Sequence, residues 1–324
     1  MTFSARSDRL VPTGHGPVLS IVLPAYNERD RLPPYLEQIR SHCDLTYGVS
    51  QDRSGQPPSA SRHQCDGGHD QSPSMNADTA ARADTVTKAD TVTKADPAAC
   101  RRYEVLVVDD GSDDGMRATL QDRFGDWPAL RVVRHPHNRG KGAAIRTGLA
   151  AADGQSVLIA DADGATPIDQ VAVLAAALPP NGLVVGCRDR QLAERQPIRG
   201  FLGAVYRRYL AALSPPGTPD PQCGFKLLSR PLVDHVQPIL TEAGYLLDLE
   251  LLLLASRGGY PIATCPIRWT EQPGSKVRLL RDGISLLLGP ARVHRRVRGA
   301  APPRSVLREA GRPSEMISPA SLET

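Results

Sequence analysis

Short apolar runs alternate with helical patterns along most of this 324-residue chain. The runs show little of the polar–apolar alternation that marks a strand with one face in water. Runs of this kind, each followed by a helix, are typical of a mainly parallel sheet with helices on both faces. We therefore predict an α/β fold. The predicted strands are Leu19–Leu23, Glu104–Val108, Leu130–Val133, the run that leads into Asp161, and Leu183–Gly186, and the predicted helices are Pro34–His42, Gly142–Ala152 and Ile168–Leu178.

One long stretch departs from this alternation. Residues 45–100 contain no Ile, Phe or Trp, and they include the hexamer ADTVTK twice in tandem, at 83–88 and 89–94. A segment so poor in large apolar side chains cannot bury enough surface to offset the entropy lost on ordering. We predict a disordered insertion at 45–100 within one domain that spans 19–290. Residues 1–18 are predicted to be a flexible N-terminus, and 291–324 a basic, disordered tail.

Composition excludes several classes of protein. The formal net charge is only +4, and no basic stretch interleaved with aromatic residues occurs, so we expect no nucleic-acid partner. The first residues lack the apolar core of a signal peptide. No window approaches the roughly 18 apolar residues of a membrane-spanning helix. We expect a protein without a membrane span.

Polar and glycine-rich segments follow four consecutive predicted strands. They are PAYNE at 24–28, DDGS at 109–112, HNRGKG at 137–142 and DAD at 161–163. In open α/β sheets, ligands bind beyond the carboxyl ends of the strands. A purely structural sheet would need only turn residues there, so the pattern predicts a functional site at this edge.

The two aspartates of the fourth segment need an explanation of their own. Asp161 and Asp163 project to the same side if the strand continues through them, and their like charges repel unless a cation or a proton lies between them. The alternative is a helix start in which Thr166 is the N-cap, Pro167 follows it and Asp169 completes a capping box. That alternative accounts for the residues after the pair but not for the pair itself.

Six segments together resemble a known family. LPAYNE, VVDDGS, NRGKG, ADADGA, QCGFKL (222–227) and WTEQPGSKV (269–277) occur in the order and rough spacing of the GT-A family 2 glycosyltransferases. Over about 19–288, apart from the insertion, the chain resembles the dolichyl-phosphate β-glucosyltransferases and their bacterial polyprenyl-phosphate relatives. The resemblance implies a GT-A, Rossmann-like fold. It also implies inverting transfer of a hexose, glucose, from the nucleotide sugar UDP-glucose to a polyprenyl or dolichyl phosphate.

The resemblance also implies roles on the donor side. Asp110, beside Asp109, would accept a hydrogen bond from the imide N–H of the base, whereas the alternative for DDGS is an Asx-turn. Lys141 would place positive charge near the nucleotide, and its alternative is a solvated lysine. Asp161 and Asp163 would hold Mg²⁺ or Mn²⁺ against the diphosphate. The implied nucleotide-sugar-binding residues are Pro24, Tyr26, Glu28, Asp109, Asp110, Lys141, Asp161 and Ala162, of which the first three have a plain strand-to-helix turn as their alternative.

On the acceptor side, the resemblance implies that Arg188 and Arg199 grip the lipid phosphate, because the planar fork of arginine matches phosphate oxygens. Surface ion pairs are the alternative, with Asp189 and Glu194 as the candidate partners. Gln222, with the rest of the QCGFK segment at 222–226, would lie near the transferred sugar. Asp248 would act as a base or electrostatic partner, with a carboxylate on a helix surface as its alternative. The implied catalytic residues are therefore Asp248, Gln222 and Asp163.

The basic stretch 276–298 carries leucines and isoleucine at helical spacing up to a break at Gly289-Pro290. Such a stretch predicts peripheral contact with an anionic membrane, at its cytoplasmic face. A core-packed helix followed by a solvated tail is the alternative. Two other functions also remain open: a family 2 glycosyltransferase with a soluble acceptor, and a nucleotide-sugar-binding protein without turnover.

Overall fold

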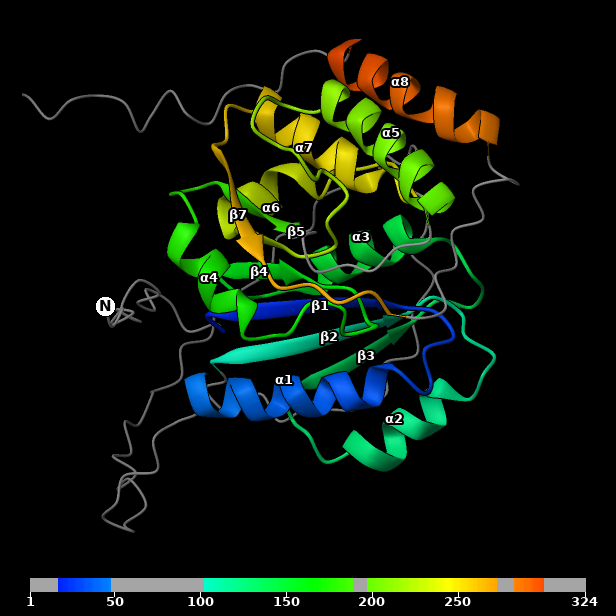
Figure 1. Ribbon diagram of the computed structural model, residues 1–324. Helices are drawn as coiled ribbons and strands as arrows, with labels where there is room; N and C mark the ends of the chain where they lie inside the picture. Colours follow the sequence, from blue (N-terminus) through cyan, green and yellow to red (C-terminus); the bar gives the residue numbers. More distant parts are fainter. Residues whose placement is uncertain (1–16, 48–101, 189–196, 273–282, 300–324) are drawn as a thin grey trace, which may run out of the picture.

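The computed structural model describes residues 17–47, 102–188, 197–272 and 283–299, although the side chains of 197–204 and 283–287 are not described (Figure 1). The predicted flexible N-terminus lies almost wholly outside these residues. So do nearly all of the predicted insertion and the tail beyond residue 299. These three predictions remain untested for the residues concerned.

A seven-stranded sheet forms the centre of the described part of the chain, in the order β3-β2-β1-β4-β6-β5-β7. All neighbouring pairs are parallel except those made by β6, which runs antiparallel to both β4 and β5. The predicted mainly parallel sheet is therefore confirmed. The strands are β1 (Leu19–Ala25), β2 (Tyr103–Asp109), β3 (Leu130–Arg134), β4 (Ser156–Ile159), β5 (Leu183–Arg188), β6 (Lys226–Ser229) and β7 (Ile262–Ile267).

Helices cover the sheet from both sides. Figure 1 shows α1 and α2 on one side, and α3, α6 and α7 on the other, with α5 and α8 outside α7. The outer pair is in contact, and α8 also packs against α7. The helices are α1 (Leu32–Tyr47), α2 (Met116–Phe124), α3 (Lys141–Ala151), α4 (Gln170–Ala177), α5 (Pro197–Leu213), α6 (Arg230–Val236), α7 (Leu247–Arg257) and α8 (Gly283–Gly299).

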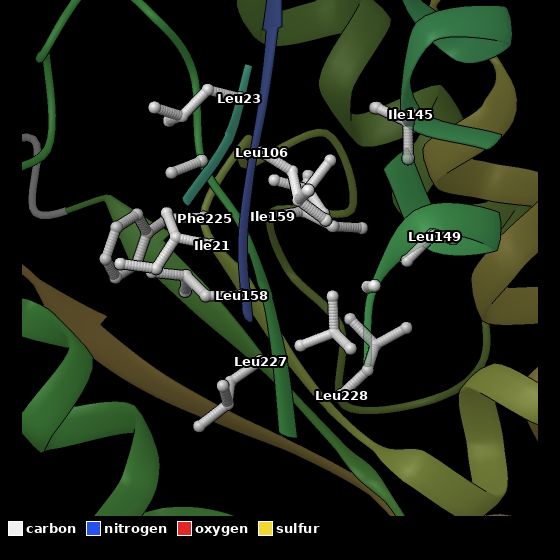
Figure 2. Close-up of a cluster of buried hydrophobic side chains, with 14 of the residues drawn as sticks. Ile21, Leu23, Leu106, Ile145, Leu149, Leu158, Ile159, Phe225, Leu227 and Leu228 are labelled. Carbon is white, nitrogen blue, oxygen red and sulfur yellow. The ribbon is translucent and has the colours of Figure 1, made fainter. Parts of the chain in front are cut away.

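Burial on both faces explains why the apolar runs show no alternation. Leu158 and Ile159 are adjacent in β4 and are both fully buried. Figure 2 shows Ile159 on the same side as Ile145 and Leu149 of α3, whereas Leu158 points toward Phe225 on the other side. Because successive strand side chains face opposite ways, a strand covered on both sides must be apolar throughout.

Helix α1 is longer than predicted. It continues to Tyr47, so residues 45–47, assigned to the insertion, belong to the helix. Cys43 is fully buried in its last turns, and the ring centroid of Tyr47 lies 6.4 Å from that of Tyr103 at the start of β2. This packing against the sheet stabilises the last turn, which has little helical signal of its own in the sequence.

Helix α8 corrects two predictions at the C-terminal end. The helix runs through Gly289 and Pro290, so the predicted break there is wrong, and residues 291–299 are helical rather than part of a disordered tail. Val293 and Val297 are 0% and 3% exposed. Their burial against the rest of the protein holds the helix together despite the proline, because tertiary packing supplies most helical stability in proteins.

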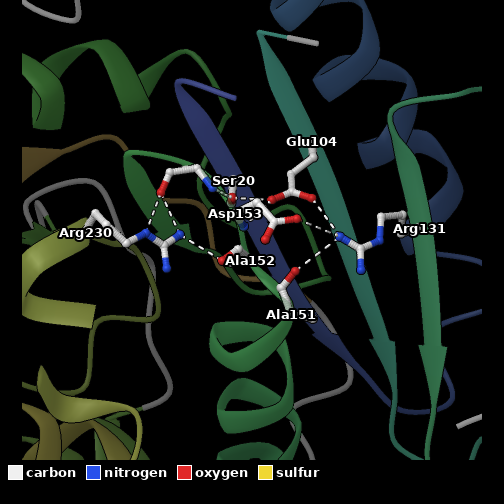
Figure 3. Close-up of polar contacts among 8 residues, drawn as sticks. Ser20, Glu104, Arg131, Ala151, Ala152, Asp153 and Arg230 are labelled. Atoms are coloured by element: carbon white, nitrogen blue, oxygen red, sulfur yellow. Dashed lines mark hydrogen bonds and ion pairs between the residues drawn. The ribbon is translucent and has the colours of Figure 1, made fainter. Parts of the chain in front are cut away.

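A polar cluster holds the amino-terminal edge of the sheet. Figure 3 shows Glu104 of β2 accepting hydrogen bonds from the Ser20 hydroxyl at 2.6 Å and the Asp153 N–H at 2.7 Å, with Arg131 Nη1 at 3.0 Å. Arg230 donates to the carbonyls of Ala152 and Gly154. The turn between α3 and β4 is thus fixed from two sides, and that turn sets where β4 begins.

The reversed direction of β6 matters for the other edge. Ile159 at the end of β4 is paired with Lys226 at the start of β6. The residues that precede β6 therefore lie beside the residues that follow β4. This brings the QCGFK segment to the DAD segment, about 60 residues earlier in the chain.

Candidate active site

The segments predicted to meet at the carboxyl edge do contact one another. The Asn27 N–H donates to the Ser112 hydroxyl at 2.9 Å, and its side-chain oxygen accepts from the Asp113 N–H at 3.0 Å. These bonds join the segment after β1 to the segment after β2. Other bonds, described below, join β2 to the NRGKG loop and that loop to the segment after β4.

Asp109 and Asp110 are both buried and both engaged. Asp109 accepts the N–H of Ser112 at 2.8 Å, which is the turn-forming role weighed for DDGS. Asp110 accepts the N–H groups of Arg139 and Gly140 at 2.9 and 2.8 Å, and it lies 2.7 Å from His135 Nδ1. Asp110 therefore fixes the loop that precedes α3. Recognition of the base by Asp110 stays a prediction.

His135 is a site residue that the sequence analysis missed. Its second ring nitrogen lies 2.9 Å from the Thr147 hydroxyl of α3, so the ring connects β2, through Asp110, to that helix. A single histidine after a strand carries no signal of these two partners, since both are distant in sequence.

Lys141 forms an ion pair with Asp161. It is the first residue of α3, and its Nζ lies 2.6 Å from Asp161 Oδ1. Burial alone would lower the pKa of Lys141, but the carboxylates of Asp161 and Asp248 outweigh it and raise that pKa. The lysine therefore stays charged. Its side chain is only 22% exposed, so the alternative of a solvated lysine is wrong.

Asp161 and Asp163 lie in a turn after β4, which ends at Ile159. Asp163 accepts the N–H of Ala165 at 3.0 Å. Burial, followed by the charge of Asp161, raises the pKa of Asp163. Burial also acts to raise the pKa of Asp161, but Lys141 outweighs it and the pKa is lowered. The pair is thus an ionised carboxylate next to one whose ionisation is disfavoured.

The helix-capping alternative for this turn is wrong. Helix α4 begins at Gln170, and its N-cap residue, Asp169, makes no side-chain capping bond. Thr166 is instead buried, and its carbonyl accepts the Tyr35 hydroxyl at 3.0 Å. The Tyr35 ring also lies against Gly164, which has a φ of +68°. These two contacts of Tyr35 hold the turn that carries the aspartate pair.

The two aspartates fit a divalent cation that shares its ligands with a substrate. In the part of the chain that the structure describes, no group of three or more His, Cys, Asp and Glu side chains could hold a metal by itself. Mg²⁺ and Mn²⁺ bound with phosphates commonly take only one or two carboxylates from the protein. The raised pKa of Asp163 beside Asp161 marks a place where added positive charge would stabilise both carboxylates.

A second, fully buried ion pair lies next to the first. Lys226 Nζ is 2.6 Å from Asp248 Oδ1 in the first turn of α7, and it also donates to the Cys223 carbonyl. Lys226 is 0% exposed and Asp248 is 4% exposed, so Asp248 is not a carboxylate on a helix surface. The Lys226 charge contributes to the lowered pKa of Asp161. The two pairs form one network of alternating charge.

Lys226 belongs to the QCGFK segment that the resemblance places near the transferred sugar, but its ion pair was not predicted. Its signal was a lysine within the otherwise apolar run FKLL. A lysine in a buried strand requires a carboxylate partner, but the sequence does not show which carboxylate the fold supplies.

Arg188, at the end of β5, is held by Asp220. Its Nε and Nη2 each lie 2.7 Å from an oxygen of this carboxylate, and its guanidinium lies 5.4 Å from the Trp269 ring centroid. Arg188 is thus ion-paired, but to a buried carboxylate rather than at the surface. Asp189 and Glu194, the partners considered for a surface ion pair, lie outside the described residues, so that alternative stays untested. Arg199 lies in the first turn of α5, and its side chain is not described.

The remaining predicted residues differ in how far they are buried. Pro24, Tyr26 and Gln222 are half-buried. Glu28 pairs with Arg31 at 2.6 Å. Ala162 is only 4% exposed, which leaves little of its side chain to contact a ligand.

Comparisons with known proteins give a consistent result. The profile described as Glycosyl transferase family 2 matches residues 89–237. A dolichyl-phosphate beta-glucosyltransferase of Mus musculus is 30% identical over 273 residues, which cover 80% of this chain and 69% of the mouse protein. The dolichyl-phosphate beta-glucosyltransferase ALG5C of Trichomonas vaginalis is 32% identical over 187 residues, 55% of this chain and 56% of that relative. The chain thus spans little more than half of one relative and about two thirds of the other.

Among solved structures, the glucosyl-3-phosphoglycerate synthase of Mycobacterium tuberculosis, in complex with Mn²⁺, UDP and glucosyl-3-phosphoglycerate, aligns with a TM-score of 0.54. The alignment covers 88% of this chain and 81% of the synthase at 20% identity. A likeness at this identity shows a shared fold, and it confirms the predicted GT-A architecture.

None of the helices in the described ranges combines the length and the apolar character needed to cross a membrane.

Proposed function

The chain belongs to glycosyl transferase family 2, and from this premise we propose that it transfers glucose from UDP-glucose to a polyprenyl or dolichyl phosphate. The relatives named above supply the reaction class. One observation in the site carries the proposal: Lys141 and Asp161 form a 2.6 Å pair at the carboxyl edge, with Asp163 beside it. A fixed cation and a carboxylate pair that can share a divalent metal with the substrate suit a nucleoside diphosphate.

Asp161 and Asp163 would hold Mg²⁺ or Mn²⁺, which when bound neutralises charge on the leaving diphosphate. The chain's own residues would position the diphosphate. The Lys141 ammonium presents positive charge to the phosphates. Asp110 holds the loop before α3, so the residue that carries this charge is fixed before substrate arrives.

The chemical step is a single displacement. A phosphate oxygen of the acceptor forms a bond to the anomeric carbon while the bond from that carbon to the diphosphate oxygen breaks, and UDP leaves with the electron pair. A phosphate monoester is already anionic at neutral pH, so little deprotonation is required. Asp248, held by Lys226, would act as an electrostatic partner on the sugar side, and Gln222 would contact the sugar. Orientation of the two substrates is then the main source of the rate acceleration.

The acceptor phosphate would lie near the end of β5. Arg188 keeps its charge because the Asp220 carboxylate, against the effect of burial, raises its pKa. The fork to Asp220 uses Nε and Nη2 of Arg188, so Nη1 would be the atom that donates to a phosphate oxygen. Arg199 would supply a second charge. The fork to Asp220 then orients Arg188 rather than competing with the phosphate.

A peripheral membrane contact would bring the lipid to this site. On α8, Leu288 is 65% exposed, and the arginines at 292, 295 and 298 are exposed as well. Val205, on the neighbouring helix α5, is 52% exposed. Apolar and basic side chains on adjacent helices suit the headgroup region of an anionic membrane, here the cytoplasmic face.

The test uses the purified chain with Mn²⁺ and UDP-glucose labelled in the glucose. One reaction contains detergent-dispersed polyprenyl phosphate, and a second contains phosphoglyceric acid. We expect label in the organic phase of the first reaction and none in a product of the second. Label only in the water-soluble product would show that the acceptor is soluble rather than a lipid. Tight binding of UDP-glucose without release of UDP would show that the protein binds the nucleotide sugar without turnover.

A further inference from the structure

The loop between α6 and α7 lies directly against the start of α3. Its Ala243 carbonyl accepts the N–H of Ala143 at 3.0 Å. A β-carbon on Gly142 would lie 2.7 Å from the Glu242 carbonyl oxygen, and one on Gly140 would overlap the Ala243 carbonyl. The loop and the helix terminus therefore touch backbone to backbone. Any shift of the loop must move the first turn of α3, which begins at Lys141.

Glu250 of α7 holds this loop from behind. It is 1% exposed, and its carboxylate accepts the N–H groups of Thr241 and Glu242 at 3.0 and 2.8 Å and the Thr241 hydroxyl at 2.7 Å. None of these groups carries a positive charge. These hydrogen bonds stabilise the buried carboxylate, but they leave its charge close to that of the Glu242 carboxylate, so a cation placed between the two would stabilise both.

Helix α8 supplies that cation. Arg296 Nη2 lies 2.9 Å from Glu250 Oε1, and Arg296 Nη1 lies 2.9 Å from Glu242 Oε1. Arg292 lies farther from Glu242, at 3.7 Å. One guanidinium thus bridges the helix that holds the loop and the loop itself.

We infer that Arg296 is a positioning residue for donor binding, acting through Glu250 and the loop 241–244 on Lys141. Without the guanidinium, the carboxylates of Glu242 and Glu250 repel each other. The loop then moves away from Glu250, and the first turn of α3 moves with it. The Lys141 ammonium is displaced from the place where the diphosphate binds. The inference rests on the proposed function only for the identity of the ligand.

The test compares Arg296→Ala, Arg296→Lys and, as the matched control on an exposed position of the same helix, Arg295→Ala. UDP affinity is measured by calorimetry with Mn²⁺ and without lipid, so membrane contact plays no part. We expect Arg296→Ala to weaken UDP binding by about 10-fold, in the range of coupling between separate sites. Arg296→Lys should recover part of the loss, and Arg295→Ala should bind as the wild type does.

A second measurement needs no ligand. Amide hydrogen exchange at residues 140–144 should be faster in Arg296→Ala than in the wild type and unchanged in Arg295→Ala. Equal UDP affinity and equal exchange in the two alanine variants would overturn the inference. A wild type that binds no UDP would instead count against the proposed function, and the exchange comparison would still decide the role of Arg296. Arg296→Lys serves both measurements if the alanine variant does not fold.

Discussion

Gly224 lies against Asp161 so closely that a β-carbon at position 224 would overlap the aspartate's carboxylate. The contact follows from the antiparallel direction of β6, which brings the residues before Lys226 beside the residues after Ile159. Asp161 is thereby held on one side by Lys141, and on the other it lies against a position where a side chain larger than glycine would displace its carboxylate. The geometry of the carboxylate pair therefore depends on a residue that carries no chemistry.

Gly224→Ala should displace the Asp161 carboxylate. Because a misplacement of about 1 Å can cost about 100-fold in rate, we expect a loss of that order in turnover of labelled UDP-glucose. Gly299→Ala is the control, since a β-carbon there meets nothing within 4 Å. Wild-type turnover in Gly224→Ala would show that Asp161 need not lie where the structure has it.

Asp163→Asn tests the carboxylate pair. We expect turnover to fall by about 100-fold or more, as for the loss of one group that stabilises charge in the transition state. Calorimetric titration with Mn²⁺ in the presence of UDP should show binding to the wild type that the variant lacks, and EDTA should abolish wild-type turnover. Full activity of the variant at saturating Mg²⁺ would refute the metal assignment.

The same substitution should stabilise the metal-free protein at neutral pH. The native fold raises the pKa of Asp163, so the native state binds its proton more tightly than the unfolded state does. Ionisation of Asp163 therefore opposes folding as the pH rises above the unfolded pKa of about 3.9. Tm measured against pH should be higher for Asp163→Asn at neutral pH, and the gain should vanish below the ordinary aspartate range. A lower Tm for the variant throughout would contradict the sign.

Asp248→Asn leaves the Lys226 ammonium buried without a carboxylate. Breaking a buried pair from one side costs about 3–5 kcal/mol, so urea unfolding should show a loss of stability of that size. The double variant Lys226→Met with Asp248→Leu replaces both charges by apolar groups and should recover most of the stability. It should remain inactive. Turnover at the wild-type rate in the double variant would mean that the pair is structural only.

A short Gly/Ser linker in place of residues 48–101 should leave Tm and UDP affinity close to those of the wild type. The residues that flank this segment are near each other, since the Tyr47 and Tyr103 ring centroids are 6.4 Å apart. Deletion of 45–100 should instead lower Tm, because it also removes the end of α1. Thermal unfolding of the two variants side by side provides the comparison. A large loss with the linker alone would show that the replaced segment contributes to the core.

The parallel part of the fold could be predicted from local pattern. A strand such as EVLVV is apolar on both faces, and this property requires cover on both sides wherever the strand lies. The carboxyl-edge site follows from the same reasoning, because parallel strands share one edge for their ends. Helix α2 was missed, although Met116, Leu120 and Phe124 recur at helical spacing and are buried. The pattern is short and most of the residues between these three are polar, so it was not recognised as a helix.

Features that depend on contacts between distant segments could not be predicted. The direction of β6 is not encoded in its four residues. The partner of Arg188 could not be chosen because Asp220 lies 32 residues away in sequence and nearer acids competed for the assignment. Likewise, Glu250 has the same local pattern as Asp248, yet it holds a loop whereas Asp248 pairs with Lys226.

The long segment between α1 and β2 is attached at the amino-terminal edge of the sheet, whereas the candidate active site lies at the carboxyl edge. The chain leaves α1 at Tyr47 and re-enters the sheet at Tyr103, the first residue of β2, while Asp109 and Asp110 stand at the far end of that strand. A seven-residue strand makes these ends about 20 Å apart. A fluorescent domain or an affinity handle inserted between Tyr47 and Arg102 would therefore report on the protein, or tether it to a support, from the edge remote from the candidate active site.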